Sequence, residues 1–184
     1  MEIVTNEKAI VITGGPGMGK TSIIDMLRQA GYPCIGESGR QIIRQQLKIK
    51  GTSLPWADRE AYAMEMFRTG LTDYKLASEN DTYTFFDRGL PDVIGYLKLC
   101  ELPVPDHLWL ATKRNRYHNK VFITPPWPEI YVNDKERKQS LEEAIATYEA
   151  MAEVYATLGY TIIEIPKLSL EERVSFLINF LILS

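Results

Sequence analysis

The sequence predicts an α/β protein in which a five-stranded parallel sheet carries helices on both faces. Segments typical of strands and of helices alternate along all 184 residues, which is the pattern of parallel strands joined by helical crossovers. The strand segments are short, apolar runs, as expected for a sheet buried on both sides. No internal repeat, low-complexity tract or linker divides the chain, so we expect one domain over residues 1–184.

Five segments have the composition of strands. Residues 8–13 are apolar and β-branched, and residues 82–86 combine aromatic with β-branched side chains, both of which favour strands. In chain order, the predicted strands are residues 8–13, 32–36, 82–86, 121–123 and 160–165.

Helical periodicity fills the intervals between these strands. In residues 21–30, for example, Ile23, Ile24 and Leu27 share one face. The predicted helices are residues 21–30, 37–50, 56–79, 91–101, 105 to about 116, 140–158 and from 169 onward.

The last two predicted helices begin at capping boxes. In this motif a serine accepts from the first helical turn, and a glutamate three residues later reaches back to the serine backbone. The pairs are Ser140 with Glu143 and Ser169 with Glu172. They fix the starts of both helices.

Two apolar stripes are expected to face the core. In the helix 37–50 the stripe consists of Ile42, Ile43, Leu47 and Ile49. In the helix after Ser140 it consists of Leu141, Ile145, Tyr148, Ala152 and Tyr155.

Composition argues against several function classes. The hydrophobic share of 45% and the charged share of 24% are those of a soluble globular protein. The net charge of −3 argues against a general binder of nucleic acid or membrane surfaces. No apolar run reaches the roughly 18 residues of a membrane span, and residues 1–7 lack the features of a signal peptide. We therefore expect a cytoplasmic protein without a nucleic-acid partner.

The cysteines and histidines show no metal-binding spacing. Cys34 and Cys100 lie far apart, and His107 and His118 have no ligand residues nearby in the sequence. A zinc site is therefore not expected. The two cysteines are interpreted as small core residues in a reducing compartment.

Residues 14–21, Gly-Gly-Pro-Gly-Met-Gly-Lys-Thr, form a complete G-x-x-x-x-G-K-[ST] phosphate-binding loop. The loop lies between the strand 8–13 and the helix 21–30, which is the context that the motif requires. Its glycines allow successive N–H groups to point at phosphate oxygens. The alternative is a glycine-rich turn without a ligand. The motif predicts binding of a nucleoside triphosphate, ATP or GTP.

Two side chains of this loop have separate expected roles. Lys20 would reach the β- and γ-phosphates, and the Thr21 hydroxyl would bind Mg²⁺. The residues expected to contact the nucleotide are Gly14, Gly15, Pro16, Gly17, Met18, Gly19, Lys20, Thr21 and Ser22.

Asp87 and Arg88 follow the third predicted strand, at the edge of the sheet where the phosphate-binding loop lies. A carboxylate there can hold Mg²⁺ together with Thr21, and an arginine there can clamp a phosphate or carboxylate of a second substrate. The alternatives are an aspartate that caps a turn and an arginine in a surface ion pair.

Glu37 follows the second predicted strand at the same edge. Glu37, Arg40 and Arg44 fall on one side of the next helix. An acid and two arginines suit a cleft for a polar or anionic substrate, although such charges are also typical of a solvated helix face. Asp92 and Tyr96, at i and i+4 of a later helix, could hydrogen-bond substrate hydroxyls.

Residues 124–139 are a candidate lid. Three prolines precede a dense run of charges in this segment, which favours a loop. A mobile arginine can stabilise the charge of a transferring phosphoryl group. Arg137 is the first candidate for this role, with Lys135 and Lys138 behind it. The alternative is a solvated charge run before a helix.

Taken together, these motifs resemble one family. The loop at residues 14–21, Glu37-Ser38-Gly39-Arg40, Phe86-Asp87-Arg88-Gly89-Leu90-Pro91-Asp92 and Asp134-Lys135-Glu136-Arg137 are similar to those of the predicted AAA-type ATPases related to the kinase domain of NadR, the nicotinamide riboside kinase. The likeness covers almost the whole chain. It extends more distantly to nucleoside and thymidylate kinases.

The resemblance has four further implications. The fold would be the three-layer P-loop fold with strand order 2-3-1-4-5. Glu37 would act as base toward a hydroxyl, and Asp87-Arg88 would form the acid–arginine pair of nucleoside kinases. Pro166 and the adjacent Lys167 would approach the adenine.

Two main functions are compatible with these residues. The first is a kinase that moves the γ-phosphoryl group of Mg·ATP to a hydroxyl of a nucleoside-like or other polar small molecule. The second is a nucleotide-dependent regulatory ATPase, or switch, with a protein or lipid partner. A stand-alone hydrolase is a third alternative. The product of turnover distinguishes the three.

Overall fold

The structure is a computed structural model that describes residues 3–130 and 140–182. The predicted lid residues Lys135, Arg137 and Lys138 lie outside this described part. The boundaries of the lid and of the domain therefore stay predictions.

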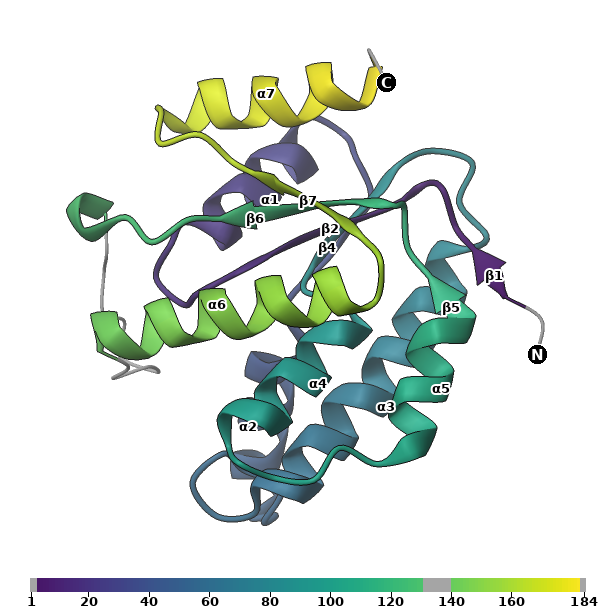
Figure 1. Cartoon of the computed structure of the whole chain (residues 1–184), viewed down its shortest axis with the longest axis vertical. Helices are drawn as coiled ribbons and strands as arrows, with labels where there is room; N and C mark the ends of the chain where they lie inside the picture. The colour runs from purple at the N-terminus through teal and green to yellow at the C-terminus, as the bar shows by residue number, and fades with distance from the viewer. Residues whose placement is uncertain (1–2, 131–139, 183–184) are drawn as a thin grey trace.

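A five-stranded parallel sheet forms the centre of the molecule (Figure 1). Its strands, in spatial order, are β3 (Cys34–Ile35), β4 (Thr84–Asp87), β2 (Ala9–Gly14), β6 (Lys120–Thr124) and β7 (Thr161–Glu164). All neighbouring pairs run parallel. Numbered along the chain, this is the order 2-3-1-4-5, so the predicted topology is confirmed.

A second, two-stranded sheet was not predicted. β1 (Val4–Thr5) pairs in parallel with β5 (Asn115–Arg116). The Tyr74 hydroxyl donates to the carbonyl of Val4 at 3.1 Å and to that of Arg116 at 2.8 Å. Strands of two residues are too short to show alternation, so the sequence carries no signal for this pair.

Helices occupy the intervals between the strands, close to their predicted positions. They are α1 (Lys20–Gln29), α2 (Ser38–Ile49), α3 (Arg59–Ala77), α4 (Leu90–Leu99), α5 (Asp106–Arg114), α6 (Leu141–Thr157) and α7 (Leu170–Ile182). A single 3₁₀ turn, η1, covers Pro128–Ile130.

Both predicted capping boxes are present. At the start of α6, the Glu143 N–H donates to the Ser140 hydroxyl at 3.2 Å, and the Ser140 N–H donates to the Glu143 carboxylate at 2.7 Å. At the start of α7, Ser169 and Glu172 make the same pair of bonds at 3.3 and 3.0 Å. These bonds satisfy backbone donors that the first helical turn leaves open.

Helices cover the two faces of the sheet in separate layers (Figure 1). Alternation along β2 divides the core, since successive side chains of a strand point to opposite faces. Ile10 and Ile12 pack in a cluster with α1 and α7. Ala9 and Val11 pack in another cluster with α3, α4 and α6. This is the predicted three-layer α/β/α arrangement.

The predicted core stripe of α2 is largely wrong. Ile42 is buried, but Leu47 is 57% exposed and Ile49 is 62% exposed. The helix packs mainly against α3, so only part of its apolar face meets another element. An apolar stripe shows that a helix has an apolar face, but it does not show how far a partner covers that face.

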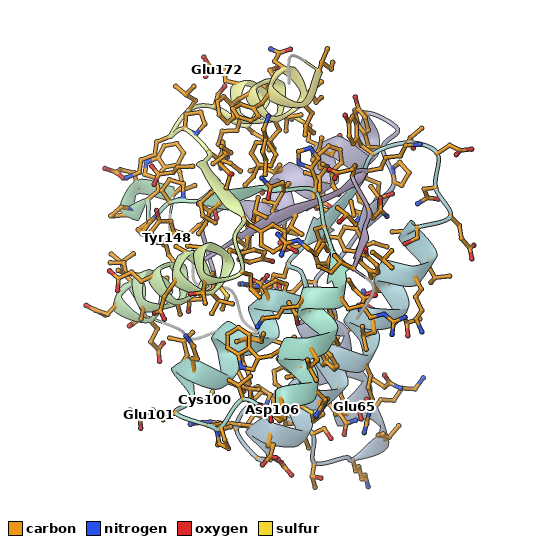
Figure 2. The ribbon with its side chains drawn as sticks, turned by 45° about the vertical axis from the view of Figure 1, so that its right-hand side comes forward. Glu65, Cys100, Glu101, Asp106, Tyr148 and Glu172 are labelled. Atoms are coloured by element: carbon orange, nitrogen blue, oxygen red, sulfur yellow. The ribbon has the colours of Figure 1, made fainter. Side chains whose placement is uncertain are left out.

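The predicted stripe of α6 is rotated. The buried residues of α6 are Ala144, Met151, Val154 and Tyr155, so of the predicted set only Tyr155 is fully buried. Tyr148 instead donates its hydroxyl to the Glu164 carboxylate at 2.8 Å (Figure 2). The reason is a close approach of α6 to two elements: its Ala144 backbone touches the phosphate-binding loop at Gly15, and its Met151 packs on Gly95 of α4.

Within the ranges that the structure describes, none of the helices is both long enough and apolar enough to cross a lipid bilayer.

Candidate functional site

The phosphate-binding loop connects β2 to α1 as predicted. Gly14, Gly17 and Gly19 have φ angles of 126°, 72° and 80°, a region that residues with a side chain rarely adopt. Lys20 is only 5% exposed, and its ammonium group donates to the Gly15 carbonyl at 2.6 Å. The loop therefore already holds its lysine inside the curl where a phosphate would bind.

Neighbouring elements support the loop from two sides. A Cβ atom at Gly15 would collide with the Ala144 carbonyl of α6, so the loop and this helix touch through their backbones. On the other side, the Trp127 N–H contacts the Met18 sulfur at 3.2 Å. These contacts position the loop between α6 and the segment after β6.

Asp87 and Arg88 lie next to this loop because β4 pairs with β2. Asp87 is the register partner of Ile12 and is only 4% exposed. Arg88 follows with a φ of 77°, and its N–H donates to the Ile12 carbonyl at 3.0 Å. A left-handed conformation is unfavourable for an arginine, and such strain is concentrated at functional sites.

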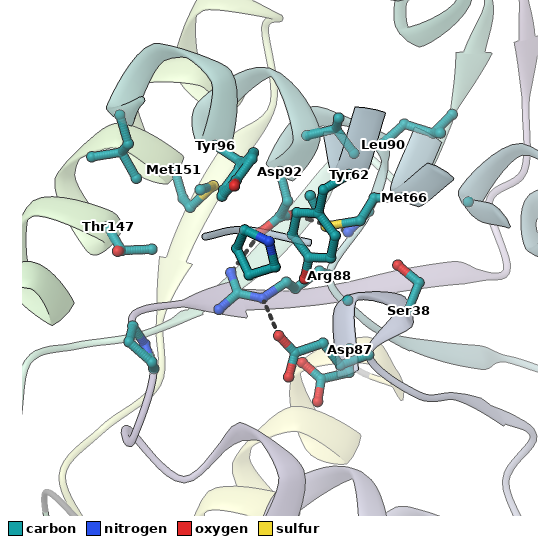
Figure 3. Close-up of a pocket in the computed structure, with 18 of the residues that line it drawn as sticks. Ser38, Tyr62, Met66, Asp87, Arg88, Leu90, Asp92, Tyr96, Thr147 and Met151 are labelled. Atoms are coloured by element: carbon teal, nitrogen blue, oxygen red, sulfur yellow. Dashed lines mark hydrogen bonds and ion pairs between the residues drawn. The ribbon is translucent and has the colours of Figure 1, made fainter. Parts of the chain in front are cut away.

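The Arg88 side chain is held between two carboxylates (Figure 3). Its Nε donates to Glu37 at 3.3 Å, and its Nη1 donates to Asp92 at 3.0 Å. Glu37 also accepts from the Nε of Arg40 at 3.3 Å. Burial alone would lower the pKa of the Arg88 guanidinium, but the nearby charges of Glu37, Asp92 and Asp87 outweigh it and raise this pKa. The arginine is fixed in place and charged.

Asp92 is surrounded by protein donors. Besides Arg88, its carboxylate accepts from the Thr13 hydroxyl at 2.5 Å, the Gly89 N–H at 2.9 Å and the Tyr155 hydroxyl at 2.7 Å. Burial and the Asp92 charge raise the pKa of Tyr155, so this hydroxyl remains a donor. The network joins β2, α4 and α6 beneath Arg88.

A cavity of about 630 Å³ opens beside these residues. Pro16 of the loop lines it together with Glu37, Asp87 and Arg88. Its walls come mainly from α2, α3, α4 and α6, and apolar and aromatic side chains that line it include Ile43, Trp56, Tyr62, Met66, Leu90, Val93, Tyr96, Leu99, Ala146 and Met151. The cavity thus joins a charged end at the loop to an apolar end between helices.

Two tyrosines mark the apolar end of the cavity (Figure 3). The rings of Tyr62 and Tyr96 pack edge to face with centroids 5.5 Å apart. The Tyr96 hydroxyl is buried and makes no hydrogen bond to any described residue. Burial raises the pKa of the Tyr96 hydroxyl most, and the neighbouring Cys100 raises it further. This hydroxyl is available as a donor to a molecule in the cavity.

The structure brings together most of the predicted substrate-side residues. Glu37, Asp87, Arg88, Asp92 and Tyr96 all line the cavity.

Two predicted residues are placed differently, since neither Arg40 nor Arg44 is among the described residues that line the cavity. Arg40 instead pairs with Glu37, and Arg44 is exposed. Pro166 follows β7 at the same edge of the sheet as the loop.

Sequence reasoning missed three residues of the site: Thr13, Tyr62 and Tyr155. Thr13 looked like an ordinary strand residue, and Tyr155 like a core aromatic. Tyr62 lies within the predicted helix 56–79, where no motif distinguishes it from the other aromatic residues. The one signal that could have found them is the hydroxyl that each carries on an element expected to be buried. A buried hydroxyl requires a hydrogen-bond partner, so each of them indicates a polar neighbour.

Comparison with known proteins places the chain in a family. The sequence model of a family described as "AAA domain" matches residues 9–173, which run from the first residue of β2 into α7. A search of the curated proteins finds no match for this chain.

Several solved structures share the fold. NadR in complex with NR has a TM-score of 0.72 and 19% identity; the match covers 95% of this chain and 51% of NadR, so this chain spans about half of NadR. Deoxyadenosine kinase from M. mycoides has a TM-score of 0.61 and 15% identity, with 94% of this chain and 97% of the kinase covered. Shikimate kinase from Acinetobacter baumannii has a TM-score of 0.57 and 14% identity, with 95% and 93% covered. Because the identities are this low, the likeness shows a common fold.

Proposed function

The chain belongs to the AAA domain family, and we propose that it is a kinase that transfers the γ-phosphoryl group of Mg·ATP to a hydroxyl of a small molecule. The observation that carries this proposal is the cavity of about 630 Å³ that joins the phosphate-binding loop to Glu37, Asp87 and Arg88. A volume of this size suits a metabolite. A protein that only hydrolyses ATP has no need for a second cavity of this size beside the loop.

In the proposed reaction the acceptor oxygen forms a bond to the γ-phosphorus while the bond from this phosphorus to the β–γ bridging oxygen breaks. ADP leaves with the bridging oxygen, and the hydroxyl proton passes to Glu37. Lys20 would exchange its bond to the Gly15 carbonyl for the β- and γ-phosphates. The contacts of Arg40 and Arg88 to Glu37 are both 3.3 Å long, longer than the roughly 2.7–2.9 Å of tight charge-assisted bonds, and they hold its carboxylate beside the cavity.

The residues present fit a magnesium ion. Thr21 offers a hydroxyl and Asp87 a buried carboxylate, and Mg²⁺ prefers one or two such oxygens together with phosphate oxygens and water. When bound, the ion would neutralise charge on the β- and γ-phosphates. Thr21 and Asp87 would hold it.

The walls of the cavity favour an acceptor with a planar ring, such as a nucleoside. Tyr62 and Tyr96 can pack against a ring, and the Tyr96 hydroxyl can donate to a ring substituent. One of the structures with this fold, deoxyadenosine kinase, holds dCMP, a ligand with such a ring, and thymidylate kinase is named for a pyrimidine nucleotide. Shikimate kinase with shikimate represents the other class, a polar acceptor without an aromatic ring.

The test is transfer of label from γ-³²P-ATP to a panel of nucleosides and hydroxylated metabolites. With an acceptor in hand, Glu37→Gln removes the proton acceptor and keeps the shape. Phosphorylation should fall by about 10²–10⁴-fold, the usual contribution of a general base, while ATP binding stays the same. Glu65→Gln is the matched control, because Glu65 is a half-exposed residue of α3 that does not line the cavity and pairs with Arg68 at 2.8 Å.

The alternatives have distinct outcomes. Label released only as inorganic phosphate would indicate a hydrolase. ATP binding without turnover on any acceptor would favour the regulatory switch. Full activity of Glu37→Gln would contradict the role of Glu37 as base.

A further inference from the structure

Arg173 of α7 lies against the phosphate-binding loop, although nothing in the sequence analysis points to it. It is only 7% exposed. A Cβ atom at Gly19 would come within 2.8 Å of the Arg173 Nη1 and within 3.5 Å of its Nη2. The guanidinium carbon also lies 5.5 Å from the centre of the Trp127 ring. The guanidinium therefore packs between the last glycine of the loop and an aromatic ring.

This buried charge has no anionic partner among the described residues. Its Nε is buried without a hydrogen bond to them, and the two groups recorded next to its guanidinium, Gly19 and the ring of Trp127, carry no charge. Glu172, next to it in the sequence, is exposed on α7 and accepts from Ser169 instead (Figure 2). Burial lowers the pKa of the guanidinium. A buried charge without a partner is unfavourable.

The position of Arg173 indicates which anion would relieve this cost. The N–H groups of the loop that contains Gly19 are arranged to accept phosphate oxygens. Arginine is suited to phosphate because its planar group can donate two parallel bonds. A stacked aromatic ring, here Trp127, holds such a group in one plane.

We propose that Arg173 is a polyphosphate-binding residue, which the C-terminal helix α7 contributes to the nucleotide site with Trp127 as the supporting ring. The proposal rests on the proposed nucleotide binding at the loop. It assigns to α7 a direct contact with the phosphates. The neutral base of the nucleotide offers no charge to Arg173, so the contact belongs to the phosphates.

The experiment compares the affinities of wild type, Arg173→Gln and Arg173→Lys for ATP, ADP and adenosine by calorimetry. Arg173→Gln should weaken ATP and ADP about tenfold or more, the effect of losing one charge-assisted contact, and should leave adenosine unchanged. Arg173→Lys should recover part of the loss because it restores the charge. Arg28→Gln is the matched control, since Arg28 of α1 is exposed and pairs with Asp25 at 2.6 Å; it should bind like the wild type.

A second measurement separates phosphate binding from a structural role. Without nucleotide, Arg173→Gln should melt at or above the wild-type temperature, because it removes a buried charge that has no anionic partner among the residues 3–130 and 140–182. A lower melting temperature together with unchanged ATP affinity would show that Arg173 only supports the fold. An equal loss of affinity for adenosine would show that it contacts the base. Wild-type protein that binds none of the three ligands would overturn the proposed function itself, whereas unchanged ATP affinity in Arg173→Gln would overturn this inference alone.

Discussion

Arg88 and Arg173 are both largely shielded from water, but their surroundings are opposite. Arg88 lies between the carboxylates of Glu37 and Asp92, and their charges raise its pKa. Arg173 packs against a glycine and an indole, has no anionic partner among the described residues, and burial lowers its pKa. The acceptor side of the site is therefore held in place by the protein itself. On the nucleotide side, the proposed partner of the cation is a ligand.

The contrast has an energetic meaning. A charge that is paired within the protein stabilises a fixed geometry before any substrate arrives. A charge that is buried without a partner lowers the stability of the free protein and returns this energy when an anion binds. Substitutions on the two sides should therefore have different effects. On the acceptor side they should lower the free energy of unfolding, and on the nucleotide side they should lower the affinity for the ligand.

The largest expected effect is that of Asp92→Ala. This change removes the acceptor of four protein hydrogen bonds, and among the described residues it leaves Glu37 as the carboxylate hydrogen-bonded to Arg88. Breaking a buried ion pair typically costs about 3–5 kcal/mol, and urea unfolding should show a loss of this size. Glu153→Ala is the control, because Glu153 pairs with Lys98 at the surface and should change stability by less than about 1 kcal/mol. A stable Asp92→Ala protein that fails only in acceptor binding would return Asp92 to the predicted role of substrate ligand.

The next effect is that of Lys20→Ala on the nucleotide side. Mg·ATP at about 100 times its dissociation constant should stabilise the wild type by about 2.7 kcal/mol, seen as a rise in melting temperature. The variant should lose most of this rise and still fold, because the interaction that it removes is made mainly with the ligand. An equal rise in wild type and variant would contradict the role of the loop.

The smallest effect is that of Tyr155→Phe, which removes one of the four donors to Asp92. We expect a loss of about 1–2 kcal/mol at neutral pH. The pKa of Tyr155 is higher in the folded protein than in the unfolded chain, so its contribution is complete below the unfolded value of about 10 and is lost as the pH rises above it. The pKa of Tyr74, raised to about 12 by burial, acts in the same direction. Stability measured from pH 9 to 12 should thus fall less steeply in Tyr155→Phe than in the wild type, and identical slopes would rule out this proton as a contributor.

The sequence was sufficient for the sheet and the loop because their signals are local. A glycine motif between an apolar strand and a helix predicts a phosphate-binding loop. A serine followed three residues later by a glutamate predicts the start of a helix. Glu37, Asp87 and Arg88 could be placed at one edge because the carboxyl ends of parallel strands meet there. These predictions need no knowledge of distant contacts.

The remaining features depend on contacts between residues far apart in the chain. Arg173 follows two glutamates at the start of a helix, which is typical of an exposed turn, and its burial depends on Trp127 and Gly19. The buried face of α6 is set by the contact of Ala144 with the loop. Because alanine is small, it contributes little to an apolar stripe, and the sequence pattern did not indicate this face. Leu47 was expected in the core because periodicity cannot show where a neighbouring element ends.

The contact between Gly15 and α6 changes how the phosphate-binding motif can vary in this chain. Position 15 is one of the four that the general motif leaves unspecified, yet a side chain there would meet the backbone carbonyl of Ala144. Because the obstacle is backbone, no replacement at position 144 can make room for it. A library that randomises position 15 and selects for nucleotide binding should therefore return only glycine. In this chain the general motif gains a further fixed position because of a helix that begins more than a hundred residues later.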